Sequence, residues 1–452
     1  MATLRPCQEI LWPEVVKIGN RPNNGMDLNR PPSPTVEPHI QAERSTPERV
    51  LDTAAALFWE KGFAATTTRE IAAAVGIQQA SLYYHVASKE SLLYQLCVSS
   101  MEQLLADVQS AVDRHEEPLD RLRALIRAHL TTLLKHQVRH VTMLTELRAL
   151  SKRHHAEVLA RRKRYANLVR AIIEEGQAAA KIRTDIPAKY LYLALLNVLN
   201  RAVIWFRTDQ PLSADQLAGE FAPIYLNGAL AEPDHGSIAL PELDNRKKRT
   251  KPSRAAKAVR RTTSQRLLDA AASLFASKGY GATSTREIAT ALGIQKASLY
   301  YHIGSKEELL YGICKSSLEQ IRSDVETALA AAADPLDRIV ALICAHVESL
   351  LRDQEKHSVA VAEMHLLSPE RLARVQALRD DYENLVRSVL DEAYSAGVLR
   401  RDIQVKYLCL SLLGLMNRLE VWYKRGGPLS PHEFGQLVGV IFLTGAAARP
   451  HA

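Results

Sequence analysis

A short stretch of the chain, QASLYYH at residues 79–85, carries hydrogen-bonding groups at high density. Amide, hydroxyl and imidazole groups of this kind can contact base edges and phosphates in a DNA major groove. The stretch has too few apolar side chains to serve packing alone, so we interpret it as a DNA-reading helix. The alternative is an ordinary helical corner with surface tyrosines. The residues that would do the reading are Gln79, Ser81, Tyr83, Tyr84 and His85.

The same stretch occurs a second time, as KASLYYH at residues 296–302, 217 positions later. With this offset the two halves of the chain correspond without a gap from about residue 44 to residue 232. A repeat of this length is the size of a domain and too long for a solenoid unit, because solenoid repeats span ~20–45 residues. The sequence therefore indicates a duplicated domain, and each copy is long enough to bury its own core.

The elements around the reading stretch are predicted to be short helices joined by a glycine turn. Thr67-x-x-Glu70 is a capping box that opens a helix, and Gly76 ends that helix. A third helix begins near Gln78, and Ser88 caps a long fourth one. Two short helices joined in this way are a helix-turn-helix. Its predicted core is Ile71, Ala72, Val75, Ile77 and Leu82, and repeat 2 has the same signals at Ser284, Glu287, Gly293, Ser305 and Glu308.

Composition and charge are those of a soluble, multidomain protein. The 452 residues are 47% hydrophobic and 24% charged, and the sequence has neither a membrane-length apolar run nor a signal peptide. We therefore expect a cytoplasmic protein, with Cys97 and Cys314 free and buried. The formal net charge is +8, and the segment 244–261 alone holds nine Lys or Arg and one Asp. Because the basic excess lies next to a reading unit, we expect this segment to contact nucleic-acid phosphates rather than only solvent.

The two stretches TTTREIAAAVGIQQASLYYHVASKESLL and TSTREIATALGIQKASLYYHIGSKEELL resemble the DNA-binding domain of the TetR family of bacterial repressors. The resemblance extends over both repeats and leaves out only the leader and the linker. It implies that each copy is an all-α unit with an N-terminal helix-turn-helix and a helical ligand-binding and dimerisation domain. The partners it implies are a double-stranded DNA operator and a small-molecule effector.

The resemblance also assigns DNA contacts to individual residues. Those that resemble phosphate-contacting residues of the family are Thr68, Arg69, Ser81, Tyr84, His85 and Lys89 in repeat 1, with Thr285, Arg286, Ser298, Tyr301, His302 and Lys306 in repeat 2. Gln79 and Tyr83, with Lys296 and Tyr300, lie at base-contacting positions. Glutamine pairs well with adenine and lysine with guanine, so Gln79 against Lys296 predicts similar but non-identical half-sites.

The family plan predicts six segments along the chain. They are a disordered leader (1–43), helix-turn-helix domain 1 (44–95), ligand-binding and dimerisation domain 1 (96–232), a basic linker (233–261), helix-turn-helix domain 2 (262–312), and ligand-binding and dimerisation domain 2 (313–449). In the family the last two long helices of each copy pair in a four-helix bundle. The matching segments are 187–207 and 213–230, with 404–424 and 430–447 in repeat 2.

Candidate effector-binding residues are Asn200, Arg201 and Trp205, with Asn417, Arg418 and Trp422 in repeat 2. Within each set the arginine and the tryptophan are four residues apart, on one helix face. Arginine can hold a phosphate and tryptophan can stack on a purine ring, but a cation–π pair or interface packing is the alternative. The segment MNRLEVWYKRGGPLSPHEF resembles TetR regulators of lipid and steroid breakdown, which suggests an acyl-CoA thioester as effector. Repeat 1 lacks the Gly-Gly of this segment, so its pocket can differ.

No spacing typical of a nucleophile, phosphate loop, metal site or bound cofactor occurs in the chain, so we do not expect an enzyme. His129, His140 and Glu146 recur as His346, His357 and Glu363. A metal site is conceivable there, but we interpret the histidines as satisfied core or surface residues. The predicted function is that of a ligand-relieved transcriptional repressor, acting as an intrachain pseudo-dimer on a near-palindromic operator. Alternatives are a dimer of whole chains with four reading helices, or a partner-binding protein that has lost DNA recognition.

Overall fold

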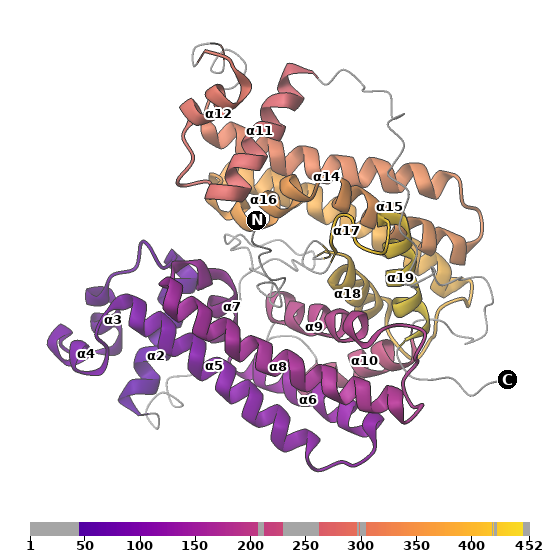
Figure 1. Cartoon of the computed structure of the whole chain (residues 1–452), viewed down its shortest axis with the longest axis horizontal. Helices are drawn as coiled ribbons and strands as arrows, with labels where there is room; N and C mark the ends of the chain where they lie inside the picture. Colours follow the sequence, from indigo (N-terminus) through magenta and orange to yellow (C-terminus); the bar gives the residue numbers. More distant parts are fainter. Residues whose placement is uncertain are drawn as a thin grey trace, which may run out of the picture. The chain divides into compact units, whose positions relative to one another are not determined.

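The computed structural model describes residues 45–206, 212–228, 262–295, 298, 304–417, 419 and 423–445. The predicted leader and basic linker lie outside these ranges. The chain divides into two compact units, Met1–Gly228 with Gly445–Ala452, and Ala229–Thr444. The regular structure of the described residues is helical, which confirms the all-α prediction (Figure 1).

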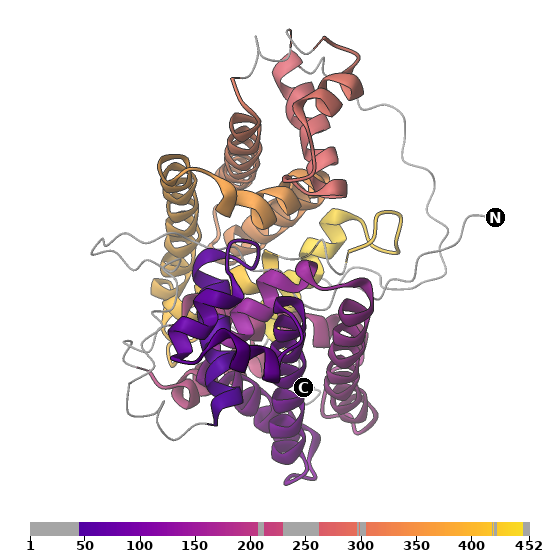
Figure 2. The same ribbon diagram turned by 90° about the vertical axis from the view of Figure 1, so that its left-hand side faces the viewer.

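Unit 1 has two parts, which we call head 1 and body 1. Head 1 consists of α2 (Thr46–Lys61), α3 (Thr68–Val75) and α4 (Gln79–His85). Body 1 consists of α5 (Lys89–Val112), α6 (Pro118–Lys135), α7 (Gln137–Glu146), η1 (Leu147–Ala149), α8 (Lys152–Ala178), α9 (Ala188–Trp205) and α10 (Ala214–Asn227). Head 1 lies at the end of the unit where α5 begins (Figure 1), and these indigo helices are in front in the turned view of Figure 2.

Unit 2 repeats this plan as head 2 and body 2. Head 2 consists of α11 (Thr263–Lys278), α12 (Thr285–Leu292) and the described residues up to Ser298. Body 2 consists of α14 (Lys306–Ala330), α15 (Pro335–Arg352), α16 (Gln354–Glu363), η2 (Met364–Leu366), α17 (Pro369–Ser395), α18 (Val405–Met416) and α19 (Pro431–Thr444). Within body 2, α19 packs closely on α15, because Gly435 has no Cβ to meet the backbone of Cys344.

The heads form where the sequence signals predict them. Thr67 accepts a hydrogen bond from the backbone of Glu70, whose carboxylate accepts one from Thr67 in return, and this capping box opens α3. Gly76 ends α3 with φ of 79°, a left-handed conformation that favours glycine. The predicted core residues Ile71, Ala72, Val75 and Leu82 are buried, whereas Ile77 is only half-buried.

One predicted helix is shorter than its sequence indicated. The expected helix over 404–424 ends at Met416, and Asn417 follows it as a cap. The imidazole of His357 lies 3.5 Å from the Asn417 carbonyl, and a backbone contact from Met416 reaches His346. Two buried imidazoles thus lie near carbonyl groups at the end of α18, and residues 418 and 420–422 after it lie outside the described part of the chain. The equivalent α9 continues to Trp205.

Candidate DNA-reading heads and effector region

Three of the predicted reading residues of head 1 lie together. The Thr68 and Tyr83 hydroxyls are 3.1 Å apart, and the Gln79 amide donates to the Thr68 hydroxyl at 3.3 Å. These bonds link the first turn of α3 to α4, and therefore fix how α4 presents its outer face. Both predicted base-contacting residues, Gln79 and Tyr83, belong to this cluster.

Several predicted reading residues of head 1 are exposed, Tyr83 of the cluster among them. Tyr84 is 88% exposed and Tyr83 49%, although most large aromatic residues are well buried in folded proteins. Ser81 and Arg69 are also exposed. The side chain of His85 lies outside the described part. A surface with two neighbouring exposed tyrosines, a serine and an arginine suits contact with a polar partner.

Lys89, expected to contact phosphate, is bound within head 1 instead. Its ammonium group donates to the carbonyls of Phe63, Ala64 and Thr66 at 2.7, 3.4 and 2.7 Å and lies 4.4 Å from the centre of the Phe63 ring. An ammonium group has three donors, so these carbonyls account for all of them. Lys89 therefore holds the turn between α2 and α3, and its contact with DNA stays a prediction.

Head 2 shows the same arrangement where it is described. Lys306 donates to the carbonyls of Tyr280 and Thr283 at 2.8 and 2.9 Å, and lies over the Tyr280 ring. Arg286 and Ser298 are exposed and Thr285 is half-exposed. The remaining predicted reading residues of this head lie outside the described residues: Lys296, Tyr300, Tyr301 and His302.

An ion pair braces α2 against α3 in head 1. Lys61 donates to the carboxylate of Glu70 at 2.8 Å. This bond, together with those from Thr67, lowers the pKa of Glu70 to about 2. Lys278 and Glu287 form the same pair at 2.6 Å in head 2, with the same pKa of about 2 for the glutamate. The capping carboxylates therefore stay ionised at neutral pH in both heads.

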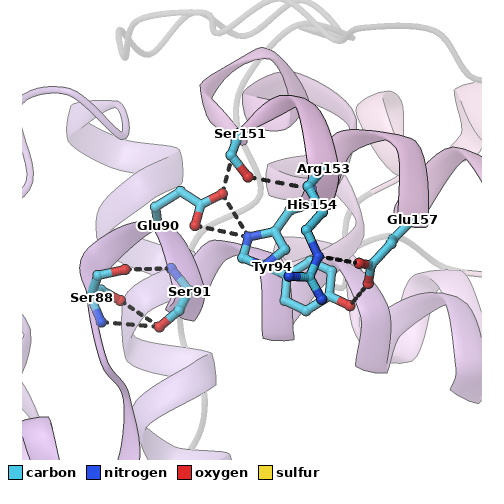
Figure 3. Close-up of polar contacts among 8 residues, drawn as sticks. All are labelled: Ser88, Glu90, Ser91, Tyr94, Ser151, Arg153, His154 and Glu157. Atoms are coloured by element: carbon cyan, nitrogen blue, oxygen red, sulfur yellow. Dashed lines mark hydrogen bonds and ion pairs between the residues drawn. The ribbon is translucent and has the colours of Figure 1, made fainter.

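A polar network joins the first turn of α5 to the first turn of α8 (Figure 3). Glu90 accepts bonds from the Ser151 backbone and from the His154 imidazole, both at 2.8 Å. Burial works to raise the pKa of Glu90, but the bonds from Ser151 and His154 together outweigh it and lower the pKa. Tyr94 stacks on His154, with ring centres 3.9 Å apart, and donates to Glu157. The network links body 1 to the point where the chain leaves head 1.

Body 1 has a buried histidine–tyrosine pair that crosses from α6 to α8. His129 Nδ1 and the Tyr165 hydroxyl are 2.6 Å apart, and both residues are fully buried. Burial lowers the pKa of His129 to about 3, and the neighbouring Asn200 amide works only weakly against it. His346 and Tyr382 repeat the pair at 2.6 Å in body 2. The sequence analysis did not single out these two tyrosines, although they occur 217 positions apart, at equivalent places in the two repeats.

The structure only partly supports the interpretation of the histidines as satisfied core residues. His129 and His346 have tyrosine partners, but both ring nitrogens of the buried His140 lack a hydrogen-bond partner among the described residues. No group of three His, Cys, Asp or Glu within the described ranges is placed to hold a metal ion. Cys97 and Cys314 are free and buried, as predicted.

The predicted effector residues are described only in part. Asn200 is buried in α9 beside the His129–Tyr165 pair, and Arg201 next to it is half-buried. The backbone of Trp205 completes α9, but its side chain lies outside the described part. In body 2, Asn417 is half-buried, whereas Arg418 and Trp422 lie outside the described residues. Asn200 is thus the residue that connects the predicted effector helix with the buried pair.

Two helix-turn-helix heads, each joined to its own helical body, define a DNA-binding regulator. The description "Bacterial regulatory proteins, tetR family" matches residues 50–96 and 267–312, and "Tetracyclin repressor-like, C-terminal domain" matches residues 115–229 and 332–446. The chain belongs to the TetR family, and it carries both domains of that family twice.

Several known regulators are similar to one unit of this chain. The HTH-type transcriptional repressor KstR2 of Mycobacterium tuberculosis is 31% identical over 188 residues, which cover 40% of this chain and 92% of that protein. The crystal structure of PfmR from Thermus thermophilus is 34% identical, with a TM-score of 0.38 over 40% of this chain and 98% of that one. AibR, solved in complex with isovaleryl coenzyme A and operator DNA, is 26% identical, with a TM-score of 0.37 over 40% of this chain and 97% of that one.

Membership of the family makes the protein a DNA-binding transcriptional repressor of a ligand-responsive class. Its domains and relatives are regulators rather than enzymes. None of the described helices is long and apolar enough to cross a membrane.

Proposed function

We propose that one chain binds one near-palindromic operator as a covalent pseudo-dimer and that a small molecule such as an acyl-CoA releases it. The observation that carries this proposal is the presence of both family domains in each half of the chain. In ordinary family members two identical chains supply the two heads, about 34–36 Å or one DNA turn apart. Here a single chain already carries both.

The apolar character of the last helices supports pairing through the bodies. In α18 the residues from Tyr407 to Met416 are buried, and apolar side chains occur on every face of this helix. A helix of this kind needs cover on all sides, as helices in the core of a bundle have. We therefore assign α18 and α19 to the pairing surface of unit 2, and α9 and α10 to that of unit 1.

The linker is long enough for the two units of one chain to pair. Its 29 residues, 233–261, reach at most ~95 Å when extended at ~3.3 Å per residue. As a flexible coil the same segment spans roughly 30 Å. A tether of this length raises the effective concentration of one unit near the other to about the millimolar range. Pairing within a chain is therefore favoured over pairing between chains.

The arginine–tryptophan sets are the proposed site for the nucleotide part of the effector. Arg201 lies four residues before Trp205, and Arg418 four before Trp422, so each pair shares a helix face. An arginine can bind a phosphate while a tryptophan stacks on adenine. Because body 2 retains the Gly-Gly segment at residues 426–427, we assign the effector to body 2 first.

The contacts of α5 indicate how ligand binding would reach the DNA. Glu90 joins the start of α5 to α8, and Lys89 joins it to the Phe63–Thr66 turn of head 1. In unit 2, Glu307 joins the start of α14 to α17 through Ser368, and Lys306 joins it to the turn before α12. A shift of α17 caused by a ligand in body 2 would therefore move α14 and the turn that positions α12, and a shift of α8 would do the same in unit 1. Operator affinity would fall without any change in a base contact, which is a coupling between two distinct sites.

A mobility-shift experiment with promoter DNA tests the proposal. Binding should weaken steeply as salt rises, because phosphate contacts release counterions. Acyl-CoA should release the wild type, and Arg418→Ala with Trp422→Ala should keep DNA binding but lose release. The matched control is Arg201→Ala with Trp205→Ala in body 1. A normal response of the body 2 variant would show that its pair is structural, and salt-insensitive binding would favour a protein that has lost DNA recognition.

A further inference from the structure

A cavity occurs at the same place in both units, where the head meets the body. In unit 1 it lies between α2, α5 and the turn from α6 to α7, and we call it junction pocket 1. Its volume is 440 Å³, within the range of cavities that hold small organic ligands. Its lining residues lie on helices other than α9, which carries the predicted effector residues. Junction pocket 1 is therefore a separate site.

The wall of junction pocket 1 contains buried polar groups without partners. The Ser100 hydroxyl and both ring nitrogens of His140 have no hydrogen-bond partner among the described residues, although both residues are buried. Burial lowers the pKa of His140 to about 3, so its ring is neutral and offers one N–H donor and one acceptor at physiological pH. Buried polar groups are nearly always paired in folded proteins, so these are available for a bound molecule.

The rim of junction pocket 1 is cationic. Arg139 is fixed there by Asp52 at 2.5 Å and by the carbonyl of Glu48 at 3.2 Å. Lys135 is exposed at the same rim and has no ion-pair partner in the described part of the chain. The carboxylate of Glu48 also lines the pocket, but it accepts the capping bonds of Ser45 at the positive end of α2. The rim can therefore attract an anion.

The corresponding cavity of unit 2, junction pocket 2, is smaller and less basic. Its volume is 90 Å³. Asp353 takes the place of His136, Gln265 that of Glu48, and Lys356 is the one lysine or arginine among the described lining residues, against Lys135 and Arg139 in unit 1. Arg352, the counterpart of Lys135, forms an ion pair with Asp324. In unit 1 the equivalent Asp107 instead accepts bonds from Thr132 and Gln103 at 2.8 and 2.7 Å.

The remaining groups of junction pocket 2 are also engaged. Lys356, the counterpart of Arg139, pairs with Asp269 at 2.6 Å. His357, the counterpart of His140, has the Asn417 carbonyl 3.5 Å from its Nε2. The same cavity is thus larger in unit 1, where Lys135 has no ion-pair partner among the described residues, and smaller in unit 2, where its counterpart Arg352 is paired with Asp324.

We propose that junction pocket 1 is a second ligand site that binds a small organic phosphate. Lys135 supplies the positive charge, and Arg139, although paired with Asp52, adds guanidinium donors. Ser100 and His140 supply neutral donors deeper in the wall, a combination that suits phosphate oxygens. Because the pocket is lined by α2 of head 1 and by α5 and α7 of body 1, an occupant contacts both parts at once. Its binding therefore stiffens the joint between head 1 and body 1 without using the effector residues of α9.

Calorimetric titration of the full chain tests this site. The probes are inorganic phosphate, glucose 6-phosphate and AMP, each at constant ionic strength. We expect at least one of them to bind with one site per chain. The variant Lys135→Gln with His136→Asp, which gives unit 1 the acidic residue of unit 2, should bind that probe about tenfold more weakly or worse. Arg352→Gln, at the position equivalent to Lys135, should bind it like the wild type.

Two controls keep the result interpretable. Operator affinity without probe should be equal in the wild type and the double variant, which shows that the variant is folded and separates this site from DNA recognition. Should the double variant be unstable, Ser100→Ala removes a donor from the wall with little change in volume and should also weaken probe binding. Failure of all three phosphates to bind, or equal binding by the wild type and the unit 1 variants, would overturn the proposal.

Discussion

The two heads of this protein are nearly the same where both are described, whereas the contacts between each head and its body, which we call the joint, are not. Both heads use a Lys–Glu ion pair, a capping box and a lysine that holds a turn through carbonyl groups. At the joint of unit 1, Arg139 binds Asp52 and Thr142 donates to the Ala55 carbonyl at 3.0 Å. In unit 2 a lysine replaces the arginine, and Val359 replaces the threonine.

The α5–α8 contact differs in the same way. Glu90 is bound by His154 in unit 1, whereas Arg371 lies 3.3 Å from Glu307 in unit 2. An arginine keeps its charge at every physiological pH, while a histidine does not. The comparison of the two units indicates that the contacts within the heads were kept after the duplication, whereas the contacts between each head and its body changed. The two units should therefore read DNA in nearly the same way, apart from the position of Gln79 and Lys296, and respond to signals differently.

The largest effect is expected when either head is disabled. Tyr83→Ala with Tyr84→Ala in head 1 should weaken operator binding about 100-fold, or ~3 kcal/mol, because two exposed residues that we expect to contact DNA are lost. Tyr300→Ala with Tyr301→Ala in head 2 should have the same effect. Fluorescence anisotropy with labelled operator measures both. A loss confined to one head would show that the two are not equivalent.

The two heads differ at one of their predicted base-contacting positions, Gln79 against Lys296, and this difference should alter the DNA sequence that each head prefers. Replacing Lys296 by Gln, the residue at position 79, should change discrimination at one base pair by ~1–3 kcal/mol. Selection of binding sites from random DNA measures the change, and the wild type should select two unlike half-sites. A perfectly symmetric site that the substitution leaves unchanged would contradict unequal reading.

Acid should destabilise unit 1 more than unit 2. Burial lowers the pKa of His129 and His140 in unit 1, and of His346 in unit 2, to about 3. His357, the unit 2 counterpart of His140, has the Asn417 carbonyl 3.5 Å from its Nε2, and such an acceptor lowers the cost of a charged ring. Below pH ~6.5 the unfolded chain binds protons that the folded chain does not, so the free energy of unfolding falls as pH falls. Each such histidine contributes a slope of up to about 1.4 kcal/mol per pH unit.

Hydrogen exchange followed by mass spectrometry measures each unit separately between pH 6.5 and 5, above the range in which most carboxylates titrate. His140→Gln should reduce the slope of unit 1 and leave that of unit 2 unchanged. Equal slopes in the two wild-type units would contradict the difference.

The smallest effect is expected from removing the Thr142 hydroxyl, which lies between α2 of head 1 and α7 of body 1. Thr142→Val gives unit 1 the residue of unit 2 and removes a buried hydrogen bond to the Ala55 carbonyl. The free energy of unfolding should fall by about 1 kcal/mol, as for a typical buried hydrogen bond. Val359→Thr is the reciprocal control. Chemical denaturation checks both, and an unchanged or higher stability of Thr142→Val would show that the bond contributes nothing.

The sequence was sufficient to predict the helical fold, the duplication and the outer face of α4. Capping boxes at Thr67 and Ser284 and turns at Gly76 and Gly293 are local signals, so their positions follow from neighbouring residues. Contacts between residues far apart in the chain could not be predicted from the sequence. Nothing near Lys89 shows that its ammonium group reaches carbonyls of the turn at residues 63–66.

The two junction pockets show why such contacts resist prediction. Asp107 and Asp324 are the same residue type at equivalent positions, yet one binds a threonine and the other an arginine. The neighbours differ at two positions, Thr132 against Ser349 and Lys135 against Arg352, and the sequence alone does not show which of them an aspartate binds. Side-chain alternatives of similar energy are decided by packing, which the sequence pattern does not reveal.

The central claim is that one chain supplies both halves of the DNA-binding unit. Light scattering of the purified chain at micromolar concentration, alone and with operator DNA, tests it most directly. The account predicts a mass near the 50.2 kDa of a single chain, and one chain per operator in the complex. A mass near twice that value, with two chains on each operator, would contradict the account and favour a dimer of whole chains with four heads.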